Sequence, residues 1–112
     1  QCQHAAVPRV NWSGCDKQDI LLRGVDLSGG NLAYADFSRA DLSGSRFHRA
    51  TLVGANFNHA NLNDADLDGA DLSYSDLRGA TLVSASLKGA VLDHAIWQDG
   101  RECAVGSRGH CQ

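Results

Sequence analysis

A large apolar residue returns at every fifth position from Leu22 to Trp97 without a break. Two positions before it stands a small or apolar residue, usually alanine, and a polar residue separates the two, as in Ala35-Asp36-Phe37. A period of five fits neither the 3.6-residue period of an α-helix nor the two-residue period of a long strand. The chain therefore has to turn every five residues, with the large and the small residue of each unit directed inward.

Glycine often occupies the last position of a unit, as at Gly24, Gly54 and Gly79. Glycine accepts unusual backbone dihedrals, so these positions are predicted to form the sharp bends. The pattern over residues 20–99 resembles the A(D/N)LXX motif of the pentapeptide-repeat family. The resemblance implies an all-β fold, a right-handed quadrilateral parallel β-helix with four units in each coil and about four to five coils.

If four units make one coil, residues twenty positions apart stack about 4.8 Å from one another. Phe37, Phe57, Leu77 and Trp97 then form one internal column. We divide the chain into an N-terminal cap with a degenerate first coil (1–19), sixteen repeats (20–99) and a C-terminal cysteine loop (100–112). In the first coil Lys17 violates the pattern, because it occupies a large apolar position.

All four cysteines lie outside the repeats, two at each end of the chain. The ends of a four-coil stack are about 19 Å apart, whereas the Cα atoms of bridged cysteines lie within about 7 Å. Local disulfides, Cys2 with Cys15 and Cys103 with Cys111, are therefore favoured among the three possible pairings. Zinc binding is the weaker alternative, because it requires closer cysteine pairs such as CxxC.

Several features favour an extracytoplasmic protein. Disulfides form in oxidising compartments, and the tail from Trp97 to Cys111 resembles the W-x-D-G-x-x-C…G-S-x-G-x-C ending of exported pentapeptide-repeat proteins. The chain contains no methionine and starts at Gln1, which suggests removal of a signal peptide, with trimming of the chain as the alternative. We expect a periplasmic or secreted protein, or one in an organelle lumen such as the thylakoid.

The charge pattern and apolar content argue against several classes of partner. Thirteen acidic and ten basic residues give a net charge of −3 without a long run of either sign, so no nucleic-acid partner is expected. No apolar stretch reaches the 18 residues of a membrane span. The five histidines are dispersed over different columns, so neither a metal site nor a cofactor is expected.

One outward column has a catalytic appearance, because Ser28, His48, Asp68 and Lys88 follow one another at intervals of twenty. A hydrolase using Ser28, His48 and Asp68 would need a pocket and oxyanion donors, and a flat wall is expected to offer neither. The neighbouring column alternates in sign, which favours a solvated ladder of charges. The protein is therefore not expected to be an enzyme.

A small apolar strip is the best candidate for a binding surface. Ala33, Tyr34, Val53 and Tyr74 are predicted to face outward on one wall, with a gap at Gly54 between the two tyrosines. Tyrosine is favoured at interfaces, although scattered apolar surface groups are also ordinary.

Two functions remain open on the sequence. The first is a non-enzymatic exported scaffold or binding module for an unknown protein, possibly as a subunit of a larger assembly. The second rests on a resemblance to the DNA-mimicking pentapeptide proteins that protect gyrase. The mixed charges and the cysteine loop at the C-terminus depart from that group, which has an apolar dimerisation helix there.

Overall fold

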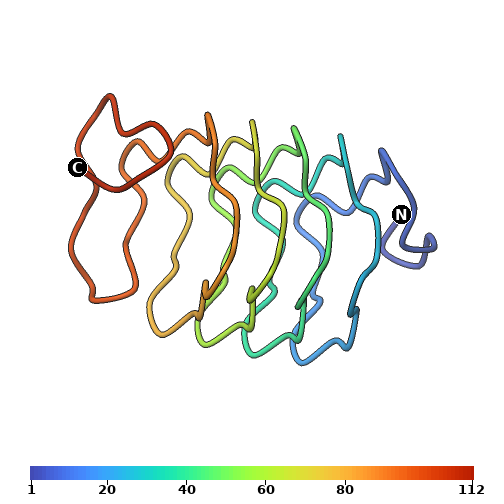
Figure 1. The fold of residues 1–112 in the computed structure, drawn as a ribbon. Helices are drawn as coiled ribbons and strands as arrows, with labels where there is room; N and C mark the ends of the chain where they lie inside the picture. Colours follow the sequence, from blue (N-terminus) through green and yellow to red (C-terminus); the bar gives the residue numbers. More distant parts are fainter.

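The chain winds into four-sided coils stacked along one axis, with the termini at opposite ends (Figure 1). This computed structural model describes residues 1–112 and measures 35 × 24 × 22 Å. It contains neither a helix nor a continuous strand, and so no helix able to cross a membrane. Single parallel β-bridges join residues twenty apart, such as Asn31 with Thr51. The predicted right-handed quadrilateral β-helix, with four pentapeptides per coil, is confirmed.

We name the four walls of the coil A to D. Wall A runs from unit 10–14 to unit 90–94, and wall B from 15–19 to 95–99. Wall C runs from unit 20–24 to unit 80–84, and wall D from 5–9 to 85–89. Successive units of one wall are twenty residues apart in the sequence. Walls A and C are opposite each other, as are walls B and D.

Hydrogen bonds between coils run along every wall. On wall A the Leu32 and Tyr34 amides donate to the carbonyls of Thr51 and Val53, both at 2.8 Å, and the Thr51 amide donates back to Gly30 at 2.9 Å. One unit therefore satisfies the backbone of the next in the manner of a parallel ladder. The coils depend on their neighbours, as in other solenoids.

The polar residue in the middle of the motif accepts a hydrogen bond from the backbone two residues later. The Oδ1 atom of Asp36 accepts a hydrogen bond from the Ser38 amide at 3.0 Å, and Asn61 accepts one from Asn63 at 3.0 Å. This is the Asx-turn geometry that favours aspartate and asparagine. It explains why either residue serves at this position, since both present the same acceptor.

Each corner is a tight turn, and the last residue before the next wall has a left-handed backbone conformation with a positive φ. The Ala35 amide donates to Leu32 at 3.1 Å, and Tyr34 between them has a φ of 60°, which is the signature of a type II turn. Ten residues other than glycine take φ values of 57–63° in the chain. The prediction that glycine forms these bends is therefore correct but incomplete, because the geometry is imposed on every unit from 5–9 to 90–94.

The core is a set of columns of fully buried side chains. The rings of Phe37 and Phe57 stack 5.5 Å apart at 8°, and the ring of Phe47 meets both edge-on. All three have no exposed surface. The predicted stacking at intervals of twenty is confirmed, and buried alanines beside these columns let the walls approach.

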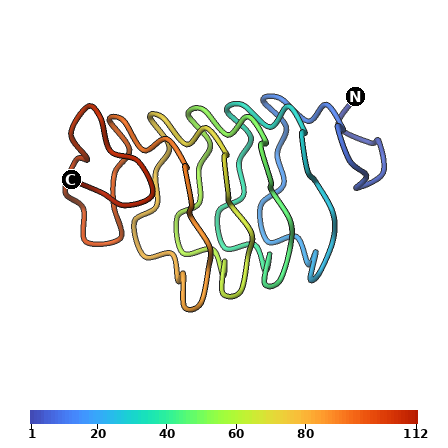
Figure 2. The same ribbon diagram turned by 45° about the horizontal axis from the view of Figure 1, so that its top comes forward.

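The C-terminal tail closes one end of the stack. It folds back antiparallel over the last units of walls A and B, where Arg108 pairs with Val91 and Glu102 with Ile96 (Figure 2). The Cys103–Cys111 disulfide, with Cα atoms 4.9 Å apart, joins the two arms of this tail. The tail forms no such bridge to walls C and D, and the amides of Leu82 and Leu87 at their ends donate to no protein acceptor.

The N-terminal end is closed by the other predicted disulfide, Cys2–Cys15, with Cα atoms 5.5 Å apart. Lys17, which violates the repeat, has a place here. Its Nζ lies 4.0 Å from the centroid of the Trp12 ring and donates to the Cys2 carbonyl at 2.6 Å. A cation over the face of an indole is an attractive contact, so Lys17 ties the cap to the first coil.

Two serines at the inward small position give a matched pair of mutations. The Ser75 hydroxyl is buried without a hydrogen-bond partner, whereas the Ser45 hydroxyl contacts the Leu22 carbonyl and the Val25 amide. We expect Ser75→Ala to raise the free energy of unfolding by about 1 kcal/mol and Ser45→Ala to lower it by a similar amount. Urea unfolding of both variants measures these changes. A change of the same sign in both free energies of unfolding would contradict the hydrogen-bond partners described here.

Candidate functional site

The apolar strip on wall A is present in the structure. Tyr34 and Tyr74 are 68% and 62% exposed, which is high for large apolar side chains, and the smaller Ala33 and Val53 beside them are half-buried. The four residues come from three successive coils. The wall places them at fixed positions, because every one belongs to a unit held by the hydrogen-bond ladder.

The gap expected at Gly54 is filled, so this detail of the prediction is wrong. The Tyr34 ring lies over Gly54, and a Cβ atom added there would be 2.4 Å from its Cε1 atom. Glycine is needed at this position for the close approach of the ring, and it adopts the φ of 67° without strain. Tyr34 therefore lies flat along the corner instead of projecting freely.

Tyr74 is held in a different way. Its ring stacks on His94 of the next coil, with centroids 4.8 Å apart and an angle of 17°. The His94 Nδ1 atom lies 3.0 Å from Oε2 of Glu102, a residue of the C-terminal tail. This chain of contacts escaped the sequence analysis, although the interval of twenty between Tyr74 and His94 was a signal for it.

The two tyrosines thus form a surface suited to protein contact. Each ring is supported along one face by its own solenoid and leaves the remainder of the ring and the hydroxyl exposed. Rigid aromatic groups contribute contact area at a small entropic cost, because their conformation is already restricted. The strip could therefore bind a complementary protein surface.

The ring over Gly54 can be tested with two substitutions at equivalent corners. Gly44→Ala adds a Cβ at a φ of 67° with nothing closer than 4.0 Å, so it measures the backbone strain of about 1–2 kcal/mol alone. Gly54→Ala adds the same strain and must also displace the Tyr34 ring. We expect a larger loss of unfolding free energy for Gly54→Ala, with a changed tyrosine near-ultraviolet signal, and equal losses would contradict the packing.

The column of Ser28, His48 and Asp68 does not assemble into a triad. The Ser28 amide donates to Asp26 at 2.9 Å, while Asp68 accepts from the Ser86 hydroxyl and from the Lys88 amide. His48 points its Nδ1 atom toward a different carboxylate, Asp66, at 3.7 Å. No hydrogen bond joins Ser28 to His48, so the column lacks the relay of a serine hydrolase.

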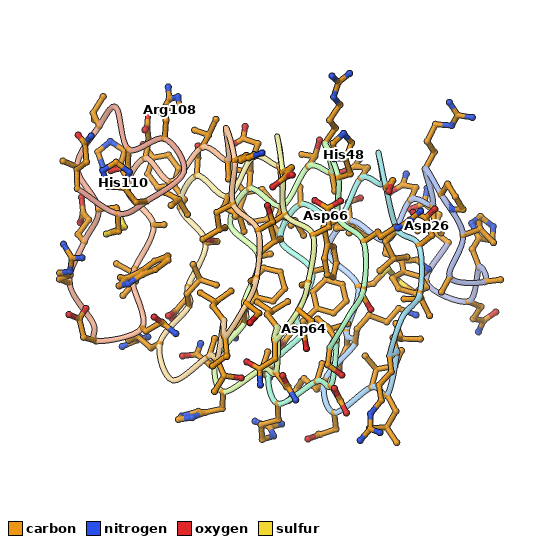
Figure 3. All side chains as sticks on the ribbon, viewed as in Figure 1. Asp26, His48, Asp64, Asp66, Arg108 and His110 are labelled. Atoms are coloured by element: carbon orange, nitrogen blue, oxygen red, sulfur yellow. A yellow bond between two sulfur atoms is a disulfide. The ribbon has the colours of Figure 1, made fainter.

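Wall D is nevertheless not flat, contrary to the sequence expectation. A shallow depression of 270 Å³ is lined by Pro8, Arg9, Ser28, Gly29, His48 and Arg49. His48 stands at its edge on the same side of the molecule as Asp26 and Asp66 (Figure 3). Repeat analysis could not reveal the depression, because it depends on where the long arginine side chains lie.

His48, Asp66 and Asp68 present ligand atoms within 4.8 Å of one another. The distribution of histidines over columns does not reveal this trio, because it combines one histidine with two aspartates from two columns. The Ser86 hydroxyl and the Lys88 backbone amide donate hydrogen bonds to Asp68, and these bonds lower its pKa. One oxygen of Asp68 is thereby already occupied, which leaves the trio as a set of paired surface charges.

Ion pairs extend over the other walls. Hydrogen bonds from Arg23, Arg78 and Arg108 lower the pKa values of Asp41, Asp76 and Asp93. These pairs have donor–acceptor distances of 2.6–2.7 Å. The walls consequently carry both signs of charge side by side, and none presents the continuous acidic face that would imitate DNA.

These lowered pKa values predict a loss of stability in acid. A carboxyl group whose pKa is lower in the folded state stabilises it above the unfolded value of about 3.9, and this contribution disappears as the pH falls through the folded pKa. We expect the melting temperature to decline below about pH 4, and Asp76→Asn to make that decline shallower. Asn56 occupies the equivalent position one coil earlier, so the substitution retains the Asx acceptor. A decline that begins well above pH 4 would contradict this account.

Comparison with known sequences decides the family. The model for "Pentapeptide repeats" matches residues 21–58 and 60–96 with eight copies. The chain belongs to the pentapeptide-repeat family. Its match covers more than half of the sequence, and it coincides with the units that build the four walls. No curated protein matches this pentapeptide-repeat chain.

Solved pentapeptide-repeat structures agree with the fold. Rfr23 from the cyanobacterium Cyanothece 51142 is 32% identical, with a TM-score of 0.79, over 80% of this chain and 62% of that one. The protein alr5209 from Nostoc PCC 7120 is 38% identical, with a TM-score of 0.71, over 74% of this chain and 68% of that one. QnrB1, a plasmid-mediated fluoroquinolone resistance protein, is 23% identical with a TM-score of 0.51, over 80% of this chain and 51% of that one, and shows the fold alone.

Proposed function

We propose that this pentapeptide-repeat protein is a non-enzymatic binding module, which contacts a protein partner through Ala33, Tyr34, Val53 and Tyr74 on wall A. The observation that carries the proposal is the support of two exposed tyrosine rings, one by Gly54 and one by His94. Residues 20–99 then act as the rigid body, and residues 1–19 and 100–112 protect its ends.

Other features support this function over catalysis or DNA mimicry. Ser28, His48 and Asp68 each contact other residues, so no activated nucleophile is available on wall D. Aspartates on the walls face arginines, as Asp41 faces Arg23, which favours a partner recognised by shape and aromatic contact. Tyrosine is also among the residues that contribute most to binding energy at protein interfaces.

The test compares two double variants on opposite walls. Tyr34→Ala with Tyr74→Ala removes the strip, and Leu21→Ala with Val83→Ala removes exposed apolar groups from wall C as the control. Proteins retained by the immobilised wild type are identified by mass spectrometry, and their dissociation constants are then measured with all three proteins. We expect at least a 30-fold weakening for the tyrosine variant, since hot-spot residues contribute about 2 kcal/mol or more.

A dissociation constant within twofold of wild type for the tyrosine variant would overturn the proposal. Selective weakening in the wall C control would overturn it as well. Both variants change exposed residues, so their melting temperatures should remain close to that of the wild type.

The module is also proposed to act outside the cytoplasm, because both ends of the solenoid carry disulfides. Such bonds persist in oxidising compartments and are rare in a reducing cytosol. The intact mass of the protein, isolated from its source cells with thiols blocked, should rise by about 4 Da on reduction, two hydrogens for each disulfide. An unchanged mass, with four blocked thiols, would remove the argument for export.

A further inference from the structure

Every arginine of this chain pairs with an aspartate except Arg9 and Arg49. The pairs are Arg23–Asp41, Arg39–Asp19, Arg46–Asp26, Arg78–Asp76, Arg101–Asp99 and Arg108–Asp93. The guanidinium groups of Arg9 and Arg49 form neither an ion pair nor a hydrogen bond with the protein. The two exceptions occupy the same corner column of wall D, two coils apart.

Residue 29, between them in the column, is a glycine and contributes no side chain of its own. Arg9 lies along the wall over this glycine, with its Cγ atom 3.1 Å from the position that a Gly29 Cβ would take. Arg49 lies in the same way over Gly69, with the corresponding distance 3.2 Å. The depression of 270 Å³ is therefore lined by both unpaired arginines, with Gly29 between their backbones.

The polar groups of the lining can all donate hydrogen bonds. Ser28 and His48 form the column beside Gly29. The Ser28 side chain hydrogen-bonds to Asp26, whereas the His48 Nε2 atom forms no hydrogen bond with the protein. Guanidinium groups present a planar fork of donors that matches the oxygens of phosphate and related anions. The backbones of Arg9 and Arg49 are about 9.6 Å apart, two coil spacings, so both side chains can reach one ion between them.

The nearest carboxylates are already engaged. Asp26 accepts from the Ser28 amide and lies 3.9 Å from Arg46, and the Ser28 hydrogen bonds lower its pKa. Asp66 accepts from the Asp68 amide and faces His48 at 3.7 Å. Asp68, also close to His48, accepts from the Ser86 hydroxyl and the Lys88 amide. Their charges are thus partly balanced by groups other than the two free arginines.

We propose that this depression on wall D binds a tetrahedral oxyanion, a phosphate or sulfate group, between Arg9 and Arg49, with His48 as a further donor. The site is separate from the tyrosine strip, so it does not depend on the proposed function. The group can be free in solution or belong to a lipid headgroup, because both present the same oxygens.

The test is a titration of the whole chain with sodium phosphate, followed by the amide resonances of Gly29, His48 and Arg49. Sodium chloride holds the ionic strength constant, because exposed charges are screened by salt. We expect saturable shifts confined to wall D, with a dissociation constant on the order of 1 mM. Sodium sulfate should compete at the same resonances.

Three variants connect the binding to the named residues. Arg9→Gln and Arg49→Gln should each weaken binding about tenfold, which is typical for a charge-assisted hydrogen bond, and the double variant should abolish saturation. Arg78→Gln on wall B, the opposite wall, removes a paired arginine and should leave the constant unchanged. Equal binding by the double variant, or unsaturated shifts spread over all arginines, would overturn the proposal.

The source of the oxyanion is distinguished by a second arm. Phosphatidylcholine vesicles carrying a phosphomonoester headgroup are sedimented with the wild type and with the double variant. Arginine-dependent sedimentation identifies a lipid phosphate as a ligand, and binding of free phosphate alone identifies a small soluble ion. Failure of both arms overturns the site and leaves the wall A proposal untouched.

Discussion

Replacing Phe57 with alanine should lower the free energy of unfolding by about 3–5 kcal/mol, the largest single-residue effect expected in this protein. Phe57 has no exposed surface, and its ring stacks on Phe37 and meets Phe47 edge-on. The ladder of backbone hydrogen bonds holds the walls at a fixed spacing, so they cannot collapse into the space left behind. Guanidinium unfolding monitored by circular dichroism measures the change.

Phe57→Leu provides the control, because Leu77 occupies the same column one coil later. We expect this substitution to cost much less than the alanine, about 1.5 kcal/mol or below. The leucine variant remains informative if the alanine variant fails to fold. A cost below about 1 kcal/mol for Phe57→Ala would show that the column is not closely packed.

Removing the C-terminal disulfide with Cys103→Ser and Cys111→Ser should cost about 2–4 kcal/mol. Cys103 is fully buried, and the tail that it anchors pairs with Leu92, His94 and Trp97 of the last coil. Without the bond these three amides should lose protection from hydrogen exchange before those of the central coils. The Tyr74–His94 stack should loosen too, because Glu102 holds His94 from the same tail.

The matching N-terminal variant, Cys2→Ser with Cys15→Ser, separates global from local effects. In a solenoid each coil contacts only its neighbours, so this variant should expose the first coil and leave the Tyr74–His94 stack intact. If both variants altered the C-terminal amides equally, the structure would be unfolding as one unit and the local account would be wrong.

The repeat, together with the four units per coil that the family resemblance implied, was sufficient to predict the walls, the register of twenty and the columns such as Phe37 over Phe57. These follow from which residues point inward, and a strict period determines that. The filled corner at Gly54 was missed, because the direction in which Tyr34 leans is a side-chain property that the period does not specify. The sequence nevertheless contains a signal, because four bulky corner residues each have a glycine twenty positions later. These residues are Arg9, Tyr34, Arg49 and His59.

The candidate sites were less predictable than the fold. The tyrosine strip could be found from outward positions in the repeat, but the support of Tyr74 by His94 and Glu102 depends on how the tail returns over wall A. Lys17 violates the repeat, and only the structure explains it, through its contacts with the Trp12 ring and the Cys2 carbonyl. The two unpaired arginines on wall D could be recognised only from the three-dimensional structure, in which every other arginine pairs with an aspartate.

We propose that wall A, and not the rest of the solenoid, contacts the protein partner. A photo-cross-linking side chain placed at Val53 on wall A or at Val83 on the opposite wall C tests it directly, since both valines hold the same position of their unit. The account predicts one discrete adduct from Val53 in the native compartment, none from Val83, and loss of the adduct with Tyr34→Ala and Tyr74→Ala. The same adduct from Val83, or one from Val53 that survives loss of both tyrosines, would contradict it.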